Sequence, residues 1–264
     1  TIACGDSHTS THGAMGALGF GIGTTEVGHV LASQTLSLNR LKVRRIEVNG
    51  DLQDGVFPKD IILRIIHDLG IKGGIGHAYE YSGTVFDNME MEGRMTVCNM
   101  SIEGGARIGY VNPDKSTFDY LSGKEFAPKG NDFENAQNYW ESIASDSDAE
   151  YDDTFEIVAD SIQPMVTWGI NPGQSLGLSD SLPDPSIFSG EDMKTAEKGY
   201  EFMGLKPGTP IRDTKIDVAF LGSCTNSRIS DLRQGANIIT GRKVNPKVRM
   251  LVVPGSQKVK KQAE

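Results

Sequence analysis

Five glycines stand among apolar residues in the segment 13–23, directly after the polar segment 4–12. Glycine has no side chain, so other backbones can approach these positions closely. The polar segment, CGDSHTSTH, concentrates a carboxylate, hydroxyls, two imidazoles and a thiol in nine residues. Titratable groups that are partly buried and paired mark reactive clefts, although Asp, Ser and Thr also form capped turns. Together the two segments favour a reactive cleft bordered by closely packed backbone.

Strand-type and helix-type patterns alternate along the rest of the chain. Helices are expected at 24–34, 58–69, 91–106, 191–205 and 228–240, and strands at 46–49, 78–81, 155–159, 216–221 and 248–253. The pair Asn49-Gly50 predicts a hairpin-type turn, and the acidic segment 114–153 predicts a solvated connection. The segment 216–253 reads as one β-loop-α-β unit, for which a right-handed crossover in a parallel sheet is the default. The expected fold class is α/β.

Charge and composition exclude several classes of function. The chain has 264 residues and a formal net charge of −9, which argues against nucleic acid or an anionic membrane as partner. No apolar run approaches the roughly 20 residues needed to span a bilayer. The glycine-rich stretches lack the dinucleotide fingerprint and the P-loop ending, so no nucleotide is expected. Three unpaired-looking cysteines and the lack of a recognisable signal peptide predict a reducing, cytoplasmic location.

Two further places carry candidate chemistry. Asn99 and Glu103 are four residues apart in an expected helix with apolar neighbours, so both side chains project from one face. Such a pair forms either a solvated face or part of a site. Cys224 lies between an expected strand and an expected helix, where the helix N-terminus favours a thiolate. That thiolate suits metal ligation or nucleophilic attack, and the alternative is a small buried core cysteine.

Four segments of the sequence carry a resemblance to a known family. They are GDSHTSTHGAMGALGFGIGTTE from Gly5, MEGRMTVCNMSIEGGA from Met91, TWGINPGQ from Thr167 and FLGSCTNSRISDLR from Phe220. In this order they resemble the aconitase superfamily, and within it the large subunits of bacterial isopropylmalate dehydratases. The resemblance implies aconitase-like α/β/α domains with mostly parallel sheets. It implies the C-terminal part of a first domain at 1–40, a second at 41–165, and a linker with the N-terminal part of a third at 166–264.

The resemblance also implies a set of catalytic residues. Asp6, Ser7 and His8 match the active-site triplet of the family, and Glu103 matches the carboxylate that pairs with the triplet histidine. A carboxylate orients an imidazole and raises its basicity, so the pairing makes physical sense. His8 and Glu103 are therefore expected within hydrogen-bond reach, across a domain cleft.

Substrate and metal positions follow from the same resemblance. Asn99 and Asn226 match substrate-binding amides of the family. Cys224 matches the first of three cysteines that hold a [4Fe–4S] cluster, and the resemblance places the other two beyond this chain. Cys4 and Cys98 match no ligand. With one of three ligands present, the cluster is expected to be absent from this piece, which is expected to be inactive alone.

The implied activity is a hydro-lyase reaction of leucine biosynthesis. In it, 2-isopropylmalate loses water to give isopropylmaleate, which regains water as 3-isopropylmalate. The open iron of the cluster acts as a Lewis acid toward this dicarboxylate, and a separate small subunit supplies the serine that takes the carbon-bound proton. A homoaconitase- or aconitase-type hydro-lyase is the nearest alternative. A hydrolase with Cys224 as nucleophile and His8 or His12 as base is an alternative of another class.

Overall fold

The computed structural model describes residues 1–222 and 225–264 of the chain. The chain forms two compact units, Thr1–Gly208 and Thr209–Glu264. Among the described residues, the strands pair in parallel except for one short antiparallel pair, so the expected α/β class with mostly parallel sheets is confirmed. In the same residues, no helix combines the length and the apolar character that crossing a membrane requires. The division of the chain into three domain parts stays a prediction.

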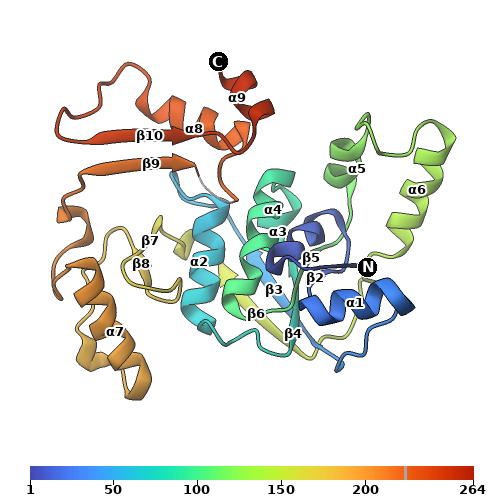
Figure 1. Ribbon diagram of the computed structural model, residues 1–264, viewed down its shortest axis with the longest axis horizontal. Helices are drawn as coiled ribbons and strands as arrows, with labels where there is room; N and C mark the ends of the chain where they lie inside the picture. The colour runs from blue at the N-terminus through green and yellow to red at the C-terminus, as the bar shows by residue number, and fades with distance from the viewer. Residues whose placement is uncertain (223–224) are drawn as a thin grey trace. The chain divides into compact units, whose positions relative to one another are not determined.

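A parallel sheet forms the centre of the first unit (Figure 1). Its strand order is β5-β4-β3-β6, with bounds Ile108–Val111, His77–Ser82, Lys42–Asn49 and Asp153–Val158. Alternate side chains of a strand point to the same face of a sheet, and Ile46, Tyr81 and Ile157 share the buried face. The helices α2 (Pro58–Leu69) and α4 (Met91–Met100) supply the rest of this core.

Helix α2 begins and ends as its sequence predicts. Pro58 occupies the first turn, where its missing N–H is not needed. The backbone N–H of Phe57 donates to Asp60 Oδ2 at 2.7 Å, which caps the helix. Gly70 then adopts a φ of 79°, which favours glycine, and the helix stops. The buried isoleucines of α2 each contribute about 1.5–3 kcal/mol of hydrophobic stabilisation, so the helix is anchored firmly to the sheet.

The N-terminal segment packs its backbone directly against the sheet. It contains β1 (Ile2–Cys4), the 3-10 helix η1 (Ser7–Met15), β2 (Gly19–Gly21) and α1 (Thr24–Ser33). A Cβ atom at Gly13 would lie 1.6 Å from the carbonyl oxygen of Gly109 on β5. Only glycine allows this approach, which seats η1 against β5 and α4. The close backbone packing expected for the segment 13–23 is confirmed.

The helix expected at 91–106 ends earlier than predicted. Helix α4 stops at Met100 and continues as the 3-10 turn η2 (Ser101–Gly104). Gly105, with φ 86°, turns the chain, and the N–H of Ala106 donates to Ser101 O at 3.1 Å. All residues of α4 except Glu92 are buried, so it is an internal helix as its apolar composition indicates.

The segment 114–153 is not the plain connection that its acidic composition predicts. It contains α5 (Lys115–Leu121) and α6 (Asn131–Ser142). The rings of Phe118 and Trp140 stack with centroids 6.1 Å apart and join the two helices. The segment is therefore helical in part, and an aromatic contact packs its two helices together.

The turn expected at Asn49-Gly50 is also wrong, because β3 pairs in parallel with both of its neighbours. The helix expected at 191–205 is confirmed as α7, with slightly different ends. The remaining elements of the first unit are α3 (Thr84–Asp87), η3 (Ala159–Ser161), β7 (Met165–Thr167), β8 (Ser175–Gly177), η4 (Pro185–Ile187) and α7 (Gly190–Met203). β7 and β8 form the antiparallel pair.

The second unit contains the β-loop-α-β unit that the sequence predicts. Its elements are η5 (Ile211–Asp213), β9 (Val218–Gly222), α8 (Ile229–Ile239), β10 (Arg249–Val253) and α9 (Gln257–Ala263). β9 and β10 pair in parallel, with Val218 opposite Arg249.

Candidate active site

The polar triplet of residues 6–8 lies at the start of η1. Asp6 caps this helix, because its Oδ1 accepts a hydrogen bond from the N–H of His8 at 2.7 Å. The Thr9 hydroxyl donates to the carbonyl oxygen of Asp6 at 2.6 Å and closes the turn. His8 has φ −88° and ψ 19°, a sparsely populated region where many active-site residues are found. The capped-turn and reactive-cleft readings of this segment therefore describe the same local structure.

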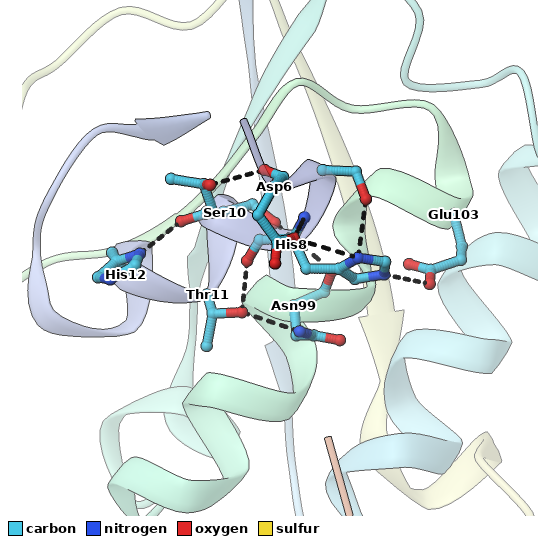
Figure 2. Close-up of polar contacts among 9 residues, drawn as sticks. Asp6, His8, Ser10, Thr11, His12, Asn99 and Glu103 are labelled. Carbon is cyan, nitrogen blue, oxygen red and sulfur yellow. Dashed lines mark hydrogen bonds and ion pairs between the residues drawn. The ribbon is translucent and has the colours of Figure 1, made fainter. Parts of the chain in front are cut away.

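His8 is held from both sides of its ring (Figure 2). Its Nε2 lies 2.9 Å from Glu103 Oε1, and its Nδ1 lies 2.9 Å from Ser7 Oγ. An ionised carboxylate only accepts hydrogen bonds, so Nε2 carries a hydrogen. In the neutral ring Nδ1 then accepts from the Ser7 hydroxyl. The expected hydrogen-bond distance between His8 and Glu103 is confirmed. Both residues lie within the first compact unit, and a domain cleft between them stays a prediction.

Glu103 has a second carboxylate oxygen, Oε2, that is buried and has no hydrogen-bond partner among the described residues. A buried acceptor without a donor costs about 1–3 kcal/mol. Native structures rarely leave such a group unpaired unless it has a use. Oε2 is therefore a buried acceptor that the described residues leave unused, next to the oxygen that holds His8.

Asn99 is fixed by a hydroxyl group of η1. The Asn99 side chain is buried, and its Nδ2 donates to Thr11 Oγ1 at 2.8 Å. The Thr11 hydroxyl in turn donates to the carbonyl oxygen of His8 at 2.7 Å. Figure 2 shows the amide oxygen of Asn99 pointing away from Thr11. Thr11 therefore links the amide of Asn99 to the backbone that carries His8.

Replacing Thr11 by Val is expected to lower the free energy of unfolding by about 1–3 kcal/mol, because the buried Nδ2 of Asn99 loses its acceptor. Thr11→Ser keeps the hydroxyl and is the matched control, with an expected loss of less than about 1 kcal/mol. Urea unfolding followed by circular dichroism measures both variants. Equal losses for the two would mean that the methyl group, and not the hydroxyl, makes the contribution.

The described residues do not fit a metal cluster on their own. They contain no group of three or more His, Cys, Asp or Glu side chains arranged to hold an ion. Cys98 is buried, and burial raises the pKa of its thiol well above the usual range, which disfavours the thiolate that binds metals. Cys4 is exposed at the end of β1. Cys224, the expected ligand, lies outside the described residues.

Asn226, the other expected substrate-binding amide, belongs to the second unit. Its Nδ2 donates to Asp231 Oδ1 at 3.3 Å, and Asp231 Oδ2 accepts from the N–H of Arg228 at 2.9 Å. Asp231 thus ties the loop after β9 to the first turn of α8. Of the expected site residues, the structure brings Ser7, His8 and Glu103 into one hydrogen-bonded chain.

Sequence reasoning missed the linking role of Thr11 within the segment 4–12. The available signal was the density of hydroxyl residues there. Four of the hydroxyls in this segment take part in hydrogen bonds to the backbone or to a site residue, those of Ser7, Thr9, Ser10 and Thr11. The hydroxyl residues are therefore abundant because they form the hydrogen bonds that hold η1 in place.

The chain is similar to known proteins along its whole length. A family model described as "Aconitase family (aconitate hydratase)" matches residues 1–264. The "3-isopropylmalate dehydratase large subunit" of Crocosphaera subtropica is 61% identical over 264 residues, which are 100% of this chain and 56% of that protein. The proteins of the same description from Microcystis aeruginosa and Trichormus variabilis are 60% and 62% identical, with the same coverage.

The chain thus spans little more than half the length of these relatives. The family match, in contrast, extends over every residue of the chain and includes the triplet 6–8 and Glu103. On this evidence the chain belongs to the aconitase family.

Proposed function

We propose that this chain forms part of the large subunit of a 3-isopropylmalate dehydratase. This hydro-lyase of leucine biosynthesis interconverts 2-isopropylmalate and 3-isopropylmalate through isopropylmaleate. A separate small subunit completes the enzyme, and the cytoplasm is its location. The substrate is a small hydroxydicarboxylate, and no nucleic acid or membrane takes part.

The proposal rests on one chemical observation. Hydrogen bonds link Ser7 to His8 and His8 to Glu103. Removal and return of water require a group that moves a proton beside the reacting hydroxyl. Glu103 holds the imidazole with a hydrogen on Nε2 and stabilises its charged form. His8 Nδ1 can then exchange a proton with the Ser7 hydroxyl, which faces out of η1 as an exposed residue.

The remaining group of this site, the Asn99 amide, serves binding. The Asn99 amide, whose nitrogen is occupied by Thr11, offers its oxygen to a donor on the substrate. That oxygen suits the hydroxyl of a hydroxy acid, while Glu103 acts through His8. A [4Fe–4S] cluster belongs to the proposal through the resemblance at Cys224, and the roles given to His8, Glu103 and Asn99 do not depend on it.

The test is a chimera in which this chain replaces the matching 264 residues of the Crocosphaera subtropica large subunit. The chimera is produced anaerobically with the small subunit of that organism. The expected result is turnover of 2-isopropylmalate, read as isopropylmaleate absorbance, and growth of a leucine auxotroph without leucine. The unmodified Crocosphaera subtropica subunit is the positive control.

The substrate panel separates the alternatives. Turnover of homoaconitate or citrate in place of 2-isopropylmalate by a folded chimera would contradict the proposal and favour a homoaconitase or aconitase. Hydrolysis of an acyl ester that is abolished by alkylation of Cys224 would favour the cysteine hydrolase.

A further inference from the structure

A glycine-rich turn, residues 71–76, lies against the short helix η2 that carries Glu103. It joins α2 to β4 and contains three glycines, at positions 73, 74 and 76. The N–H of Gly74 donates to Gly104 O at 2.9 Å, and Gly104 directly follows Glu103. The turn therefore holds η2 by its backbone, at the residue next to the carboxylate of the candidate site.

Close packing requires a glycine at position 74. A Cβ atom there would lie 2.8 Å from both Ala106 Cα and Tyr79 Oη, and closer still to Ala106 N. A side chain at this position would therefore push the turn away from Ala106. In the same contact, a Cβ atom at Gly105 would lie 3.0 Å from Ile71 O. The turn and the end of η2 are thus packed backbone against backbone.

Arg44 of β3 fixes the same turn to the sheet. Its Nη1 donates to Gly73 O at 3.0 Å, and its Nη2 donates to Asp153 Oδ2 at 2.9 Å. Its Nε donates to Asp153 Oδ1 and completes a bidentate pair. These hydrogen bonds hold the pKa of Asp153 below its ordinary value of 3.8, so the pair is ionised at neutral pH. The guanidinium also lies over the ring of Tyr79, 5.7 Å from the centroid.

These contacts form a continuous path from the sheet to Glu103. The path runs from Arg44 to the carbonyl of Gly73, and from the N–H of Gly74 to the carbonyl of Gly104. Helix η2 has four residues, and short 3-10 turns have poor internal hydrogen-bond geometry. The 2.9 Å distance between His8 Nε2 and Glu103 Oε1 (Figure 2) therefore depends on what holds η2 from outside.

We propose that Gly74 and Arg44 position Glu103 against His8 through the turn 71–76. The inference rests on the proposed function for the reaction that this pair serves. Gly74 and Arg44 are positioning residues, because they act through Glu103 and not on the substrate. A displacement of about 1 Å can lower the rate of a catalysed step about 100-fold, so a small shift of the turn is enough to affect turnover.

Kinetics of the chimera provide the first test. Gly74→Ala is expected to lower kcat about 10- to 100-fold, because the added Cβ displaces the turn and with it Glu103. KM for 2-isopropylmalate is expected to change less than about 3-fold, since loss of an interaction made in the transition state lowers kcat and kcat/KM together. Gly28→Ala is the matched control with an unchanged kcat, because a Cβ atom at Gly28 has no neighbour within 4 Å.

Arg44 variants perturb the turn more mildly and decide the matter if Gly74→Ala does not fold. Arg44→Met removes the donor to Gly73 O and is expected to lower kcat about 2- to 30-fold. Arg44→Lys restores the charge and one donor, so its kcat is expected to lie between those of Arg44→Met and the unsubstituted chimera. Arg64→Met is the matched control, because Arg64 also forms an ion pair and donates to a backbone carbonyl, that of Ser161.

Proton NMR of the 264-residue chain reads the position of Glu103 without turnover. The Hε2 proton of His8 is expected as a sharp downfield signal that is absent from His8→Ala, because the carboxylate bond deshields it and slows its exchange with water. In Gly74→Ala and Arg44→Met the signal is expected to move upfield and broaden, as it does in Glu103→Ala. Circular dichroism shows whether each variant is folded.

The two tests separate failure of the inference from failure of the proposed function. A displaced His8 signal in folded Gly74→Ala or Arg44→Met, with no turnover of 2-isopropylmalate by the unsubstituted chimera, would keep the positioning role and remove the assigned enzyme. An unchanged His8 signal in the folded variants would overturn the positioning role, whatever their kcat, because Glu103 would still hold His8. Equal losses of kcat in Arg44→Met and Arg64→Met would also overturn it, as would a wild-type chain without the downfield signal.

Discussion

Replacing Glu103 by Ala in the active chimera is expected to lower kcat about 10²- to 10⁴-fold, the range for loss of a general acid–base group. The variant removes the carboxylate that lies 2.9 Å from His8 Nε2, so the ring loses both its fixed tautomer and the stabilisation of its charged form. Glu103→Gln keeps an oxygen that accepts from Nε2 and loses only the charge. Its kcat is therefore expected to fall less than that of Glu103→Ala.

His8→Ala is expected to lower kcat as much as Glu103→Ala, and the double variant is expected to lose no more than either single variant. Residues that act as one unit are strongly non-additive, because removing one member already disables the other. A double variant whose loss equals the product of the single losses would contradict the coupled pair. Glu197→Ala, an exposed carboxylate on α7, is the matched control. Steady-state assays with isopropylmaleate absorbance measure all variants, after thermal unfolding has shown that each is folded.

Part of this site could be predicted from sequence because its members are chemically dense and close together. Residues 4–12 concentrate polar chemistry in one segment, whereas Glu103 lies 95 residues after His8, a separation that no periodic pattern bridges. The resemblance to a family supplied that pairing, and the structure gives its distance. The role of Thr11 depends on how η1 packs on α4. Such tertiary contacts have no local signature, so sequence reasoning could not assign them.

In the fold too, elements with a local sequence pattern could be predicted and those that depend on tertiary contacts could not. Helix α2 and the unit from β9 to β10 were predictable because apolar residues recur with the period of the element and because Pro58 and Gly70 mark the ends of α2. Helices α5 and α6 were missed because polar residues dominate them, and the contact between Phe118 and Trp140 that joins them has no local signature. The end of α4 was misplaced because the turn at Gly105 is set by a positive φ, which composition does not reveal.

Arg94 supports the helix that carries the site. It is fully buried in α4 and forms a bidentate ion pair with Asp114, with Nη1 to Oδ1 at 2.8 Å and Nη2 to Oδ2 at 2.7 Å. Its Nε donates to Met89 O and its Nη2 to Phe86 O, both at 3.0 Å. Asp114 also caps α5, since its Oδ1 accepts from the N–H of Thr117 at 3.1 Å. One guanidinium thus connects α4, the turn before it and the start of α5.

Replacing Arg94 by Met is expected to lower the free energy of unfolding by about 3–5 kcal/mol. The Asp114 carboxylate and the backbone carbonyl groups that the guanidinium contacts lose their donor. Urea unfolding of the 264-residue chain, followed by circular dichroism and tryptophan fluorescence, measures the loss. Arg94→Lys keeps the charge but cannot form the bidentate pair, and it is expected to lose nearly as much. A loss below about 1 kcal/mol for Arg94→Met would mean that the pair is neutral for stability.

The pH dependence of stability gives an independent check on this pair. Burial raises the pKa of Asp114, but hydrogen bonds and the charge of Arg94 outweigh burial and hold that pKa below its ordinary value of 3.8. A carboxyl with a lowered pKa in the folded state adds stability that is complete above the ordinary value. This contribution is lost as the pH falls below 3.8 and through the folded pKa of Asp114. The unfolding free energies of wild type and Arg94→Met are therefore expected to converge in this acid range.

A surface ion pair close to Arg94 and Asp114 is the control that separates the effect of burial from the effect of charge. Lys115 and Asp119 are paired four residues apart on α5, and both side chains are mostly exposed. Lys115→Met removes the same formal charge as Arg94→Met, yet it is expected to cost less than about 0.5 kcal/mol, because water solvates the carboxylate that remains. The contrast isolates burial as the cause, because both variants remove a cation that pairs with an aspartate and only Arg94 is buried. Equal losses for the two variants would show instead that any charge removed near the start of α5 weakens the fold.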